Sequence, residues 1–228
     1  HALNQAAAAV QKASLSLDDV IKAVTEQLCD LGLNSGVGLY TPDRSEIEWV
    51  GFCGDARFLQ TIELLRGRSA PTSLQSTEVP WERLGAGHPA VIQMDVPTLR
   101  GITQDPLLAR QIAQLLGPMT VIVVPLRAEA HDLGYLVVAA SWLDEGSLPA
   151  IQAYANQTAI AIRNSRLIGL LAESETQYRA IFEAARDGIF VMDTTGRVVA
   201  ASLTTCQLFS TGQGTLTGRN VAALFSVS

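Results

Sequence analysis

The apolar positions of residues 16–32 follow the spacing of an amphipathic helix. They recur every three or four residues, at Val20, Ile21, Val24 and Leu28. Ser16 precedes this stretch and can cap the first turn, where two acidic residues favour the helix dipole. The pattern predicts a helix that begins after Ser16 and ends at Gly32, a residue type common at helix C-termini.

Two pairs of β-prone runs predict two hairpins. Residues 37–40 and 47–52 flank the turn-forming sequence TPDRS, and residues 119–126 and 133–140 flank a polar turn at 127–132. These runs are rich in β-branched and aromatic residues, which favour strands. Since short polar turns join antiparallel strands, the two hairpins predict an antiparallel sheet.

The sequence between the two hairpins is less regular. A helical pattern spans residues 58–65, an apolar run at 90–94 is a strand candidate, and residues 105–116 form a second helical pattern. Asp105 and Pro106 suit the cap and the first turn of this last helix. We therefore expect short helices and one further strand in this segment.

A long helix is predicted for residues 148 to about 185. All nine prolines lie between Pro42 and Pro149, and the stretch from there to Asp187 contains no proline and a single glycine, Gly169. Two hairpins flanked by helices at both ends predict an α+β architecture, in which helices cover an antiparallel sheet.

Two sets of positions on the long helix each repeat every seven residues. They alternate along the helix as Ile160, Asn164, Leu167, Leu171, Ser174, Tyr178 and Ile181. The mean spacing of about 3.5 residues predicts a parallel two-helix coiled-coil seam with a second copy of the chain. Asn164 and Ser174 place polar groups in this seam, where they can fix its register or keep it easily switched. A different stripe, which includes Ile151 and Ile162, is expected to pack on the chain's own sheet.

Composition and charge exclude several classes of protein. The 228 residues carry a net charge of −6 with only 17% charged residues, so no basic stripe for nucleic acid is expected. The most apolar runs, at 119–126 and 133–140, are shorter than the roughly 20 residues of a membrane-spanning helix. No secretory signal is visible, which indicates a cytoplasmic protein. His1 in place of methionine indicates an excised or tagged piece, which leaves room for an upstream membrane anchor.

Residues 15–168 resemble a GAF domain. The resemblance is carried by the N-terminal helix, the first hairpin and the segment GAGHPAVIQMDVP, and above all by VVPLRAEAHDLGYLVVAAS followed by YANQTAIAIRNSRL. A strand ending in Pro-Leu, a polar turn, a Leu-Gly strand and a helix ending in AIRNSRL follow one another as in that family. The resemblance implies a GAF-like antiparallel sheet with flanking helices.

A second resemblance, to the entry of a PAS domain, starts at Glu175. It is carried by SETQYRAIFEAARDGIFVMDTTGRVVAAS, whose two β-prone runs form a hairpin about TTG. Ser202 stands where that family usually has asparagine, and the chain ends before the long helix and three strands of such a domain. The expected organisation is an N-terminal extension at 1–14, a GAF-like domain at 15–168, a linker helix at 169–185 and a truncated PAS-like domain at 186–228.

GAF domains are known for binding cyclic nucleotides, bilins, haem or small metabolites, and the resemblance implies that their ligand signatures can be sought in this sequence. The chain lacks the Cys-His pair of covalent bilin attachment and the pattern of cyclic-nucleotide binders, so the cofactor is unknown. Cys29, Cys53 and Cys206 form no CxxC pair and have no neighbouring histidine. Neither a disulfide nor a metal site is predicted, and we expect buried or idle thiols.

A ligand, if one binds, is expected between the sheet and residues 81–116. This segment combines glycine-rich turns with polar side chains, whereas the terminal helices occupy the opposite face. The expected ligand-binding residues are Tyr40, Trp81, His88, Asp95, Arg100, Thr103 and Trp142. Each also has a structural explanation as a turn, surface or core residue; His88, for example, is either a ligand contact or an exposed loop histidine.

Together these features predict a non-catalytic sensory module that binds a small molecule, forms a homodimer and transmits a signal along its long helix. The resemblance implies that the full-length protein is a histidine kinase of a two-component system or a cyclic-di-GMP signalling protein. A dimerisation module without ligand is the main alternative. A small-molecule redox enzyme, such as the GAF-like proteins that reduce free methionine sulfoxide, is the other. No nucleophile, base and orienting group form a recognisable set, so we expect no enzyme activity.

Overall fold

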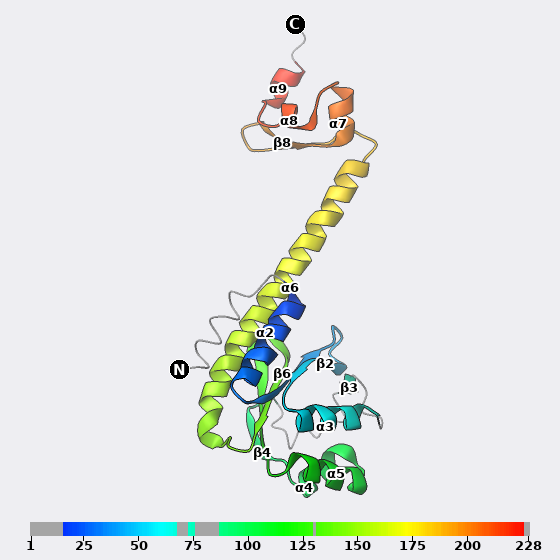
Figure 1. The fold of residues 1–228 in the computed structure, drawn as a ribbon. Helices are drawn as coiled ribbons and strands as arrows, with labels where there is room; N and C mark the ends of the chain where they lie inside the picture. The colour runs from blue at the N-terminus through cyan, green and yellow to red at the C-terminus, as the bar shows by residue number, and fades with distance from the viewer. Residues whose placement is uncertain (1–15, 68–72, 76–86, 130, 226–228) are drawn as a thin grey trace. The chain divides into compact units, whose positions relative to one another are not determined.

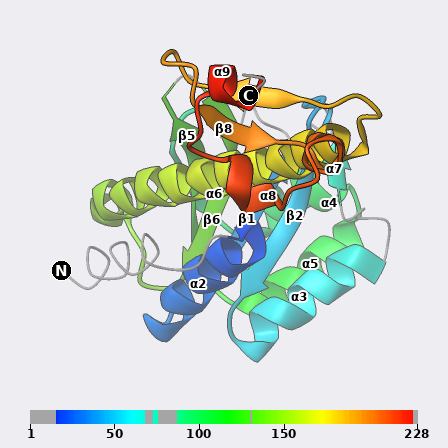
Figure 2. The same ribbon diagram turned by 90° about the horizontal axis from the view of Figure 1, so that it is seen from above.

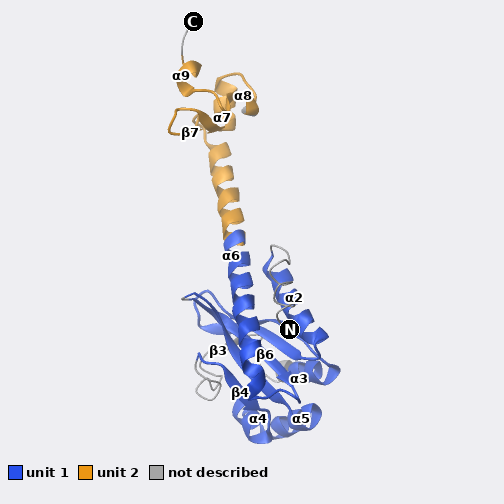
Figure 3. Ribbon diagram, turned by 90° about the vertical axis from the view of Figure 1, so that its left-hand side faces the viewer, with its two compact units in different colours: residues 1–168 blue, residues 169–228 orange. Residues whose placement is uncertain are grey.

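The structure is a computed structural model, and it describes residues 16–67, 73–75, 87–129 and 131–225. The chain divides into two compact units, unit 1 (His1–Ile168) and unit 2 (Gly169–Ser228), as Figure 3 shows. Helix α6 (Leu148–Ala184) has 37 residues and passes from the first unit into the second. The predicted long helix is therefore confirmed.

Within the described residues, unit 1 contains a six-stranded antiparallel sheet in the order β3-β2-β1-β6-β5-β4 (Figure 1). The strands are β1 (Asn34–Tyr40), β2 (Glu46–Cys53), β3 (Ser73–Gln75), β4 (Ala90–Gln93), β5 (Thr120–Ala128) and β6 (His131–Ala140). Both predicted hairpins, β1–β2 and β5–β6, are present. They form one sheet because β1 also pairs with β6.

Two helices cover one face of this sheet. Helix α2 (Leu17–Asp30) lies beside the first half of α6, and both pack on the same core (Figures 1 and 2). Ser16 caps α2 as predicted, since its hydroxyl accepts a hydrogen bond from the Asp19 amide at 3.2 Å. The buried Tyr154 of α6 places its hydroxyl 3.2 Å from the carbonyl oxygen of Val24, which ties the two helices together.

Three shorter helices form a separate layer with its own small core. They are α3 (Ala56–Gly67), α4 (Val96–Thr103) and α5 (Pro106–Leu116). Leu99, Leu108 and Ile112 are buried among them, and α3 lies beside α5 (Figure 2). Asp105 caps α5 as predicted, and its side chain accepts from the amides of the next turn. Helix α4 and strand β3 were not predicted.

A glycine of β6 explains the Leu-Gly pair of the sequence pattern. Gly134 has φ +152°, and a Cβ atom there would lie 2.0 Å from the carbonyl oxygen of Gly38 and 2.7 Å from the Cα of Leu39. These are backbone atoms of β1, the strand paired with β6. Only a residue without a side chain allows the two strands this approach.

Unit 2 contains a small hairpin with short helices around it. The elements are β7 (Phe190–Met192), β8 (Val198–Ala201), α7 (Leu203–Leu208), α8 (Gln213–Leu216) and α9 (Val221–Leu224). Cys206 and Leu216 are buried in its core. Ser202 caps α7, and its hydroxyl also accepts from the Ile189 amide at 3.1 Å. Serine thus performs a local structural role at this position.

The helices of the described ranges are either too short or too polar for the apolar core of a bilayer. None of them combines the length and the apolar character needed to cross a membrane. This agrees with the short apolar runs of the sequence.

Candidate functional site

The two faces of the sheet carry separate clusters of apolar side chains. On β5, Ile122 and Val124 pack with α2 and α6, while Val121 and Val123 belong to a second cluster on the opposite face. This alternation is the period of two of a β-strand. The second cluster also contains Ile47, Met119, Tyr135 and Ala139. We call this face, opposite α2 and α6, the floor.

Aromatic side chains extend the floor across β1 and β2. Trp49 and Phe52 stack with ring centroids 5.4 Å apart. They lie over two glycines of β1: a Cβ atom on Gly36 would be 3.0 Å from the Phe52 ring, and one on Gly38 would be 3.3 Å from the Trp49 ring. The glycines therefore leave room for two large side chains on the floor.

A pair of tyrosines introduces polar groups on this apolar surface. The hydroxyls of Tyr40 and Tyr135 are 3.3 Å apart, and the rings meet edge to face with centroids at 6.0 Å. Burial raises the pKa of Tyr135 above its usual value, and the Tyr40 hydroxyl raises it further. The Tyr135 hydroxyl is thus a neutral donor and acceptor at physiological pH.

Charged groups lie next to the tyrosine pair. Arg127 of β5 contacts Asp132 of β6, with 2.5 Å between Nε and Oδ1. Arg44, in the turn between β1 and β2, donates to the carbonyl oxygen of Asp132 at 3.4 Å. The negative charge of Asp132 raises the pKa of Tyr135, and the positive charge of Arg127 lowers it. The two hairpins therefore bring two guanidinium groups, one carboxylate and two phenols together.

The loop before β4 reaches the same place. A Cβ atom on Gly87 would lie 2.8 Å from a terminal nitrogen of Arg127, so this guanidinium lies over the loop backbone. Gly87 has φ +79°, a conformation that favours glycine. A nearby acid, Asp43, is held by Thr41 and Ser45, whose hydrogen bonds lower its pKa to about 2.

An ion pair connects this hairpin to α6. Glu129, in the turn between Arg127 and Asp132, contacts Arg163 of α6 at 2.7 Å. The hydrogen bond and charge of Arg163 lower the pKa of Glu129, and Glu129 raises that of Arg163. Arg163 follows Ile162, a fully buried core residue of α6. The contact therefore falls where α6 leaves the core of unit 1.

The expected ligand residues are only partly brought together. Tyr40 belongs to the cluster, and the exposed His88 follows Gly87, which lies under Arg127. Trp81 lies outside the described residues. The sequence did not identify Arg127 or Tyr135. The sequence indicated these two residues only by their positions on the paired strands of the second hairpin. An arginine or a tyrosine in a strand does not by itself indicate a ligand site.

Three further expected residues have structural roles on or beside α4. Asp95 caps this helix, and the side chain and amide of Thr98 lower its pKa. The Thr103 hydroxyl donates to the Leu99 carbonyl oxygen at 2.9 Å, and Arg100 is exposed. These contacts give Asp95 and Thr103 local structural roles, and their part in ligand binding stays a prediction.

Trp142 lies apart from the other expected ligand residues. Trp142 follows β6 in a turn and is 61% exposed. Tyr135 is the fifth of the ten residues of that strand, and the five steps from Tyr135 to Ala140 alone span about 16 Å at the rise of a strand. Trp142 is therefore beyond the far end of β6, away from Tyr40, and its part in a ligand site stays a prediction.

The expected seam residues lie on exposed parts of α6. The side chains of Leu167, Leu171 and Ile181 are 52%, 71% and 74% exposed, and Ile160 and Tyr178 are also exposed. Asn164 and Ser174 are exposed as well. Leu170, outside the predicted seam, is 63% exposed. The helix thus presents an apolar surface, and the seam stays a prediction.

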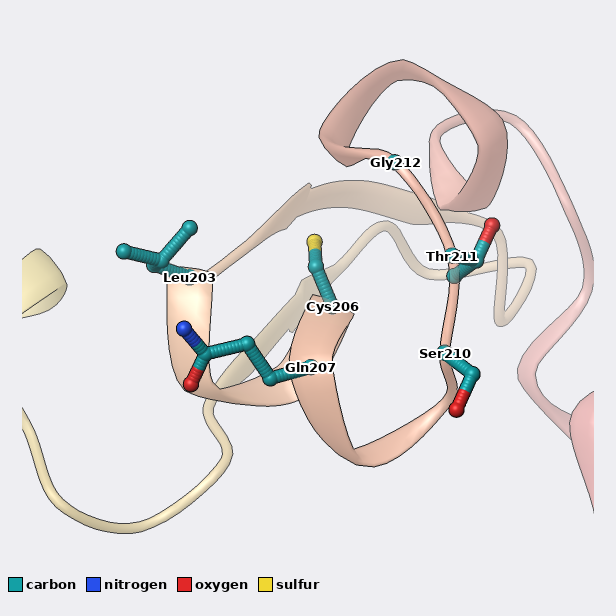
Figure 4. Close-up of a pocket in the computed structure, with 6 residues that line it drawn as sticks. All are labelled: Leu203, Cys206, Gln207, Ser210, Thr211 and Gly212. Atoms are coloured by element: carbon teal, nitrogen blue, oxygen red, sulfur yellow. The ribbon is translucent and has the colours of Figure 1, made fainter.

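Unit 2 offers a hollow of about 460 Å³ on α7 and the turn after it (Figure 4). Its lining residues are Leu203, Cys206, Gln207, Ser210, Thr211 and Gly212. Cys206 is buried in the core of the unit, so the polar lining comes from hydroxyl and amide groups alone. In the described part of the chain, no group of three or more histidine, cysteine or acidic residues could hold a metal ion.

Solved structures with the same arrangement of helices and sheet identify the fold of unit 1. A GAF domain of a phosphoenolpyruvate-protein phosphotransferase from Coxiella burnetii superposes with a TM-score of 0.53, at 18% identity, over 74% of this chain and 95% of that one. Unit 1 has the GAF fold. Residues 176–228 match the PAS fold family. We call unit 1 the GAF unit and residues 176–228 the PAS segment.

Other structures with this fold differ in function. Free methionine-R-sulfoxide reductase from Neisseria meningitidis, solved with its substrate, gives a TM-score of 0.51 at 17% identity, over 72% of this chain and 88% of that one. Residues 122 to 287 of a methyl-accepting chemotaxis protein give 0.50 at 19% identity, over 73% and 98%. No curated protein matches the chain. At these identities the likeness establishes the fold and no particular activity.

Proposed function

We propose that the chain is a non-catalytic sensory module of a signalling protein, in which the GAF unit binds a small organic acid and α6 carries the signal. The proposal rests on one observation: an apolar floor is bordered by a cluster of Tyr40, Tyr135, Arg127 and Asp132. Combined GAF and PAS folds are typical of sensory proteins, which supports this function.

The chemistry of the cluster indicates the ligand class. The side chains of Arg127 and Asp132 are about half exposed, so a ligand acid can reach the guanidinium in competition with Asp132. The partly exposed Tyr40 phenol can donate to or accept from the same ligand, and Tyr135 lies buried behind it. The partly exposed rings of Trp49 and Phe52, at the margin of the buried floor, suit a hydrocarbon or aromatic body. A carboxylate or phosphate attached to an apolar group fits this arrangement.

A path from the site to α6 follows from the hairpin. A ligand that displaces Asp132 from Arg127 alters the β5–β6 turn, which holds Glu129 against Arg163. The neighbouring surface of α6 carries the predicted seam with a second copy of the chain. Ligand occupancy would thus bias the packing of two α6 helices, and the PAS segment follows along the same helix.

The ligand proposal predicts a specific loss in Arg127→Gln. In a panel of small carboxylates and phosphates followed by thermal shift and chemical-shift mapping, we expect at least one to perturb the Tyr40–Tyr135 region. Loss of a charge-assisted hydrogen bond of about 1.5–3 kcal/mol should weaken binding roughly 10- to 100-fold in Arg127→Gln. Arg186→Gln, an exposed change in unit 2, is the control and should bind as the wild type does.

Several outcomes would contradict this site. Perturbations confined to α6 or to the PAS segment would place the ligand elsewhere, and equal binding by Arg127→Gln would remove Arg127 from recognition. If the purified protein carries no small molecule by native mass spectrometry and no panel member binds, the alternative of a dimerisation module without ligand is favoured.

The non-catalytic part of the proposal has a direct assay. We expect no turnover of free methionine sulfoxide, because Cys53, like Gly51 two residues before it, faces α2 and not the floor. Sulfoxide reduction coupled to a dithiol reductant would be measured for the wild type and for Cys53→Ser. Turnover that disappears in Cys53→Ser would establish the redox-enzyme alternative.

A further inference from the structure

Two cysteines that are distant in the sequence lie on facing surfaces of α2 and β2. On α2, Ile21, Thr25 and Cys29 are spaced four residues apart and therefore share one side of the helix. Cys29 and Cys53 are both partly exposed free thiols. Whether the two thiols can meet depends on how closely this side of α2 approaches β2.

A glycine makes that approach close. A Cβ atom on Gly51 would lie 2.5 Å from the Cγ2 of Ile21 and 3.4 Å from the Cγ2 of Thr25, so α2 lies directly on the strand backbone here. Cys53 is two residues further along β2, on the same face as Gly51. One turn of helix beyond Thr25 and two residues of strand beyond Gly51 cover similar lengths, about 6 Å each. The two cysteines therefore come into register.

A second strand, β1, fixes this position. Ser35 of β1 pairs with Cys53 of β2, and its hydroxyl donates to the Thr25 carbonyl oxygen at 3.4 Å. Thr25 is thus held by both strands immediately before Cys29. The two thiols act on each other: burial and the interaction with the Cys29 thiol raise the pKa of Cys53 to about 11.

We propose that Cys29 and Cys53 are a redox-sensitive pair that forms a reversible disulfide with a low-molecular-weight disulfide as oxidant. One thiolate attacks the oxidant RSSR and releases one RSH, which gives a mixed disulfide. The other thiolate then attacks the protein sulfur and releases the second RSH. Two protein thiols lose two protons and two electrons, and one RSSR becomes two RSH. A dithiol reductant reverses the reaction.

The disulfide would join α2 covalently to the end of β2. Helix α2 is bound to α6 through Tyr154, whose hydroxyl contacts both Val24 and Gln27 at 3.2 Å. Gln27 and Cys29 belong to the same turn of α2. Oxidation therefore restrains the helix that supports the start of α6. This adds a redox input on the face of the sheet opposite Tyr40 and Arg127, independent of the proposed ligand.

Trypsin separates the two cysteines cleanly, which provides the test. Cleavage after Lys22, Arg44 and Arg57 gives peptides 23–44 and 45–57, with Cys29 in the first and Cys53 in the second. The full chain is incubated in mixtures of reduced and oxidised glutathione, alkylated and digested without reduction. We expect a joined 23–44/45–57 peptide in most of the protein at high oxidised glutathione, and its loss after reduction.

The variants distinguish a pair from general thiol oxidation. Cys206→Ser should keep the joined peptide, whereas Cys29→Ser and Cys53→Ser should lose it. The oxidised wild type should also melt about 5 °C or more above the reduced form, because a crosslink restricts the unfolded chain. The proposal is wrong if peptides 23–44 and 45–57 stay separate in the wild type at the highest ratio of oxidised to reduced glutathione. This holds whether the separate cysteines are alkylated or bound to glutathione.

Discussion

Gly134→Ala is expected to destabilise the GAF unit by roughly 4 kcal/mol or more, an exceptional loss for a single methyl group. The added Cβ atom would lie 2.0 Å from the Gly38 carbonyl oxygen and 2.7 Å from the Leu39 Cα. Both are backbone atoms, so no side-chain rotation relieves the contact. The β1 and β6 strands must separate at the centre of the sheet, where the two predicted hairpins join.

The matched control is Gly169→Ala on α6. No heavy atom lies within 4 Å of a Cβ at this exposed helix position, so alanine should stabilise the helix by about 0.5–1 kcal/mol. All three tryptophans lie in the GAF unit, so tryptophan fluorescence during urea or thermal unfolding follows this unit. A Gly134→Ala protein that unfolds at the wild-type midpoint would contradict the close strand contact.

The elements of the fold were predictable where local pattern determines structure. The caps Ser16 and Asp105 and the two β-branched hairpins indicated the main helices and strands, and their order matched the GAF pattern. Helix α4 was missed although Asp95 and Pro97 provide an N-cap and a first-turn proline, because its eight residues are too few for a clear periodic signal. Strand β3 has three residues and is defined by its pairing with β2.

The pairing of the cysteines could not be predicted, because a bulge changes the register of β2. Counting by two from Ile47 places Trp49, Gly51 and Cys53 on one face. The bulge opposite Val37 and Gly38 inserts one residue, so Gly51 pairs with Val37 and faces α2 while Trp49 stays on the floor. A sequence pattern does not show such an insertion. The position of Cys53 beside Cys29 follows from it.

The cluster of Tyr40, Tyr135, Arg127 and Asp132 was missed for a related reason. Arg127 and Asp132 were interpreted as parts of a polar turn, whereas both lie in paired strands, and Leu133 is the extra residue of a second bulge. That irregularity brings Arg127 opposite Asp132, with Tyr135 nearby. Asp95 and Trp142 were chosen by residue type and proximity in sequence to loops. Their positions depend on a helix cap and on the end of β6.

The wild-type chain is expected to form a dimer at tens of micromolar concentration, and Leu167→Glu with Leu171→Glu is expected to abolish it. Both leucines are more than half exposed in the single chain, and they occupy successive positions of the sevenfold pattern. A two-helix seam would bury four of them. At about 1.5–3 kcal/mol for each buried leucine, their replacement by glutamate should weaken association by roughly 1,000-fold or more.

The control for this experiment carries the same charge change on another side of α6. Ala172→Glu with Thr176→Glu also places two acids four residues apart, at exposed positions outside the sevenfold pattern. Sedimentation equilibrium of all three proteins separates the explanations. Dimerisation of wild type and control, with a monomeric leucine variant, assigns the interface to this stripe. Equal loss in both variants would mean that added negative charge alone prevents association, and a monomeric wild type would remove the helix pair from the signalling mechanism.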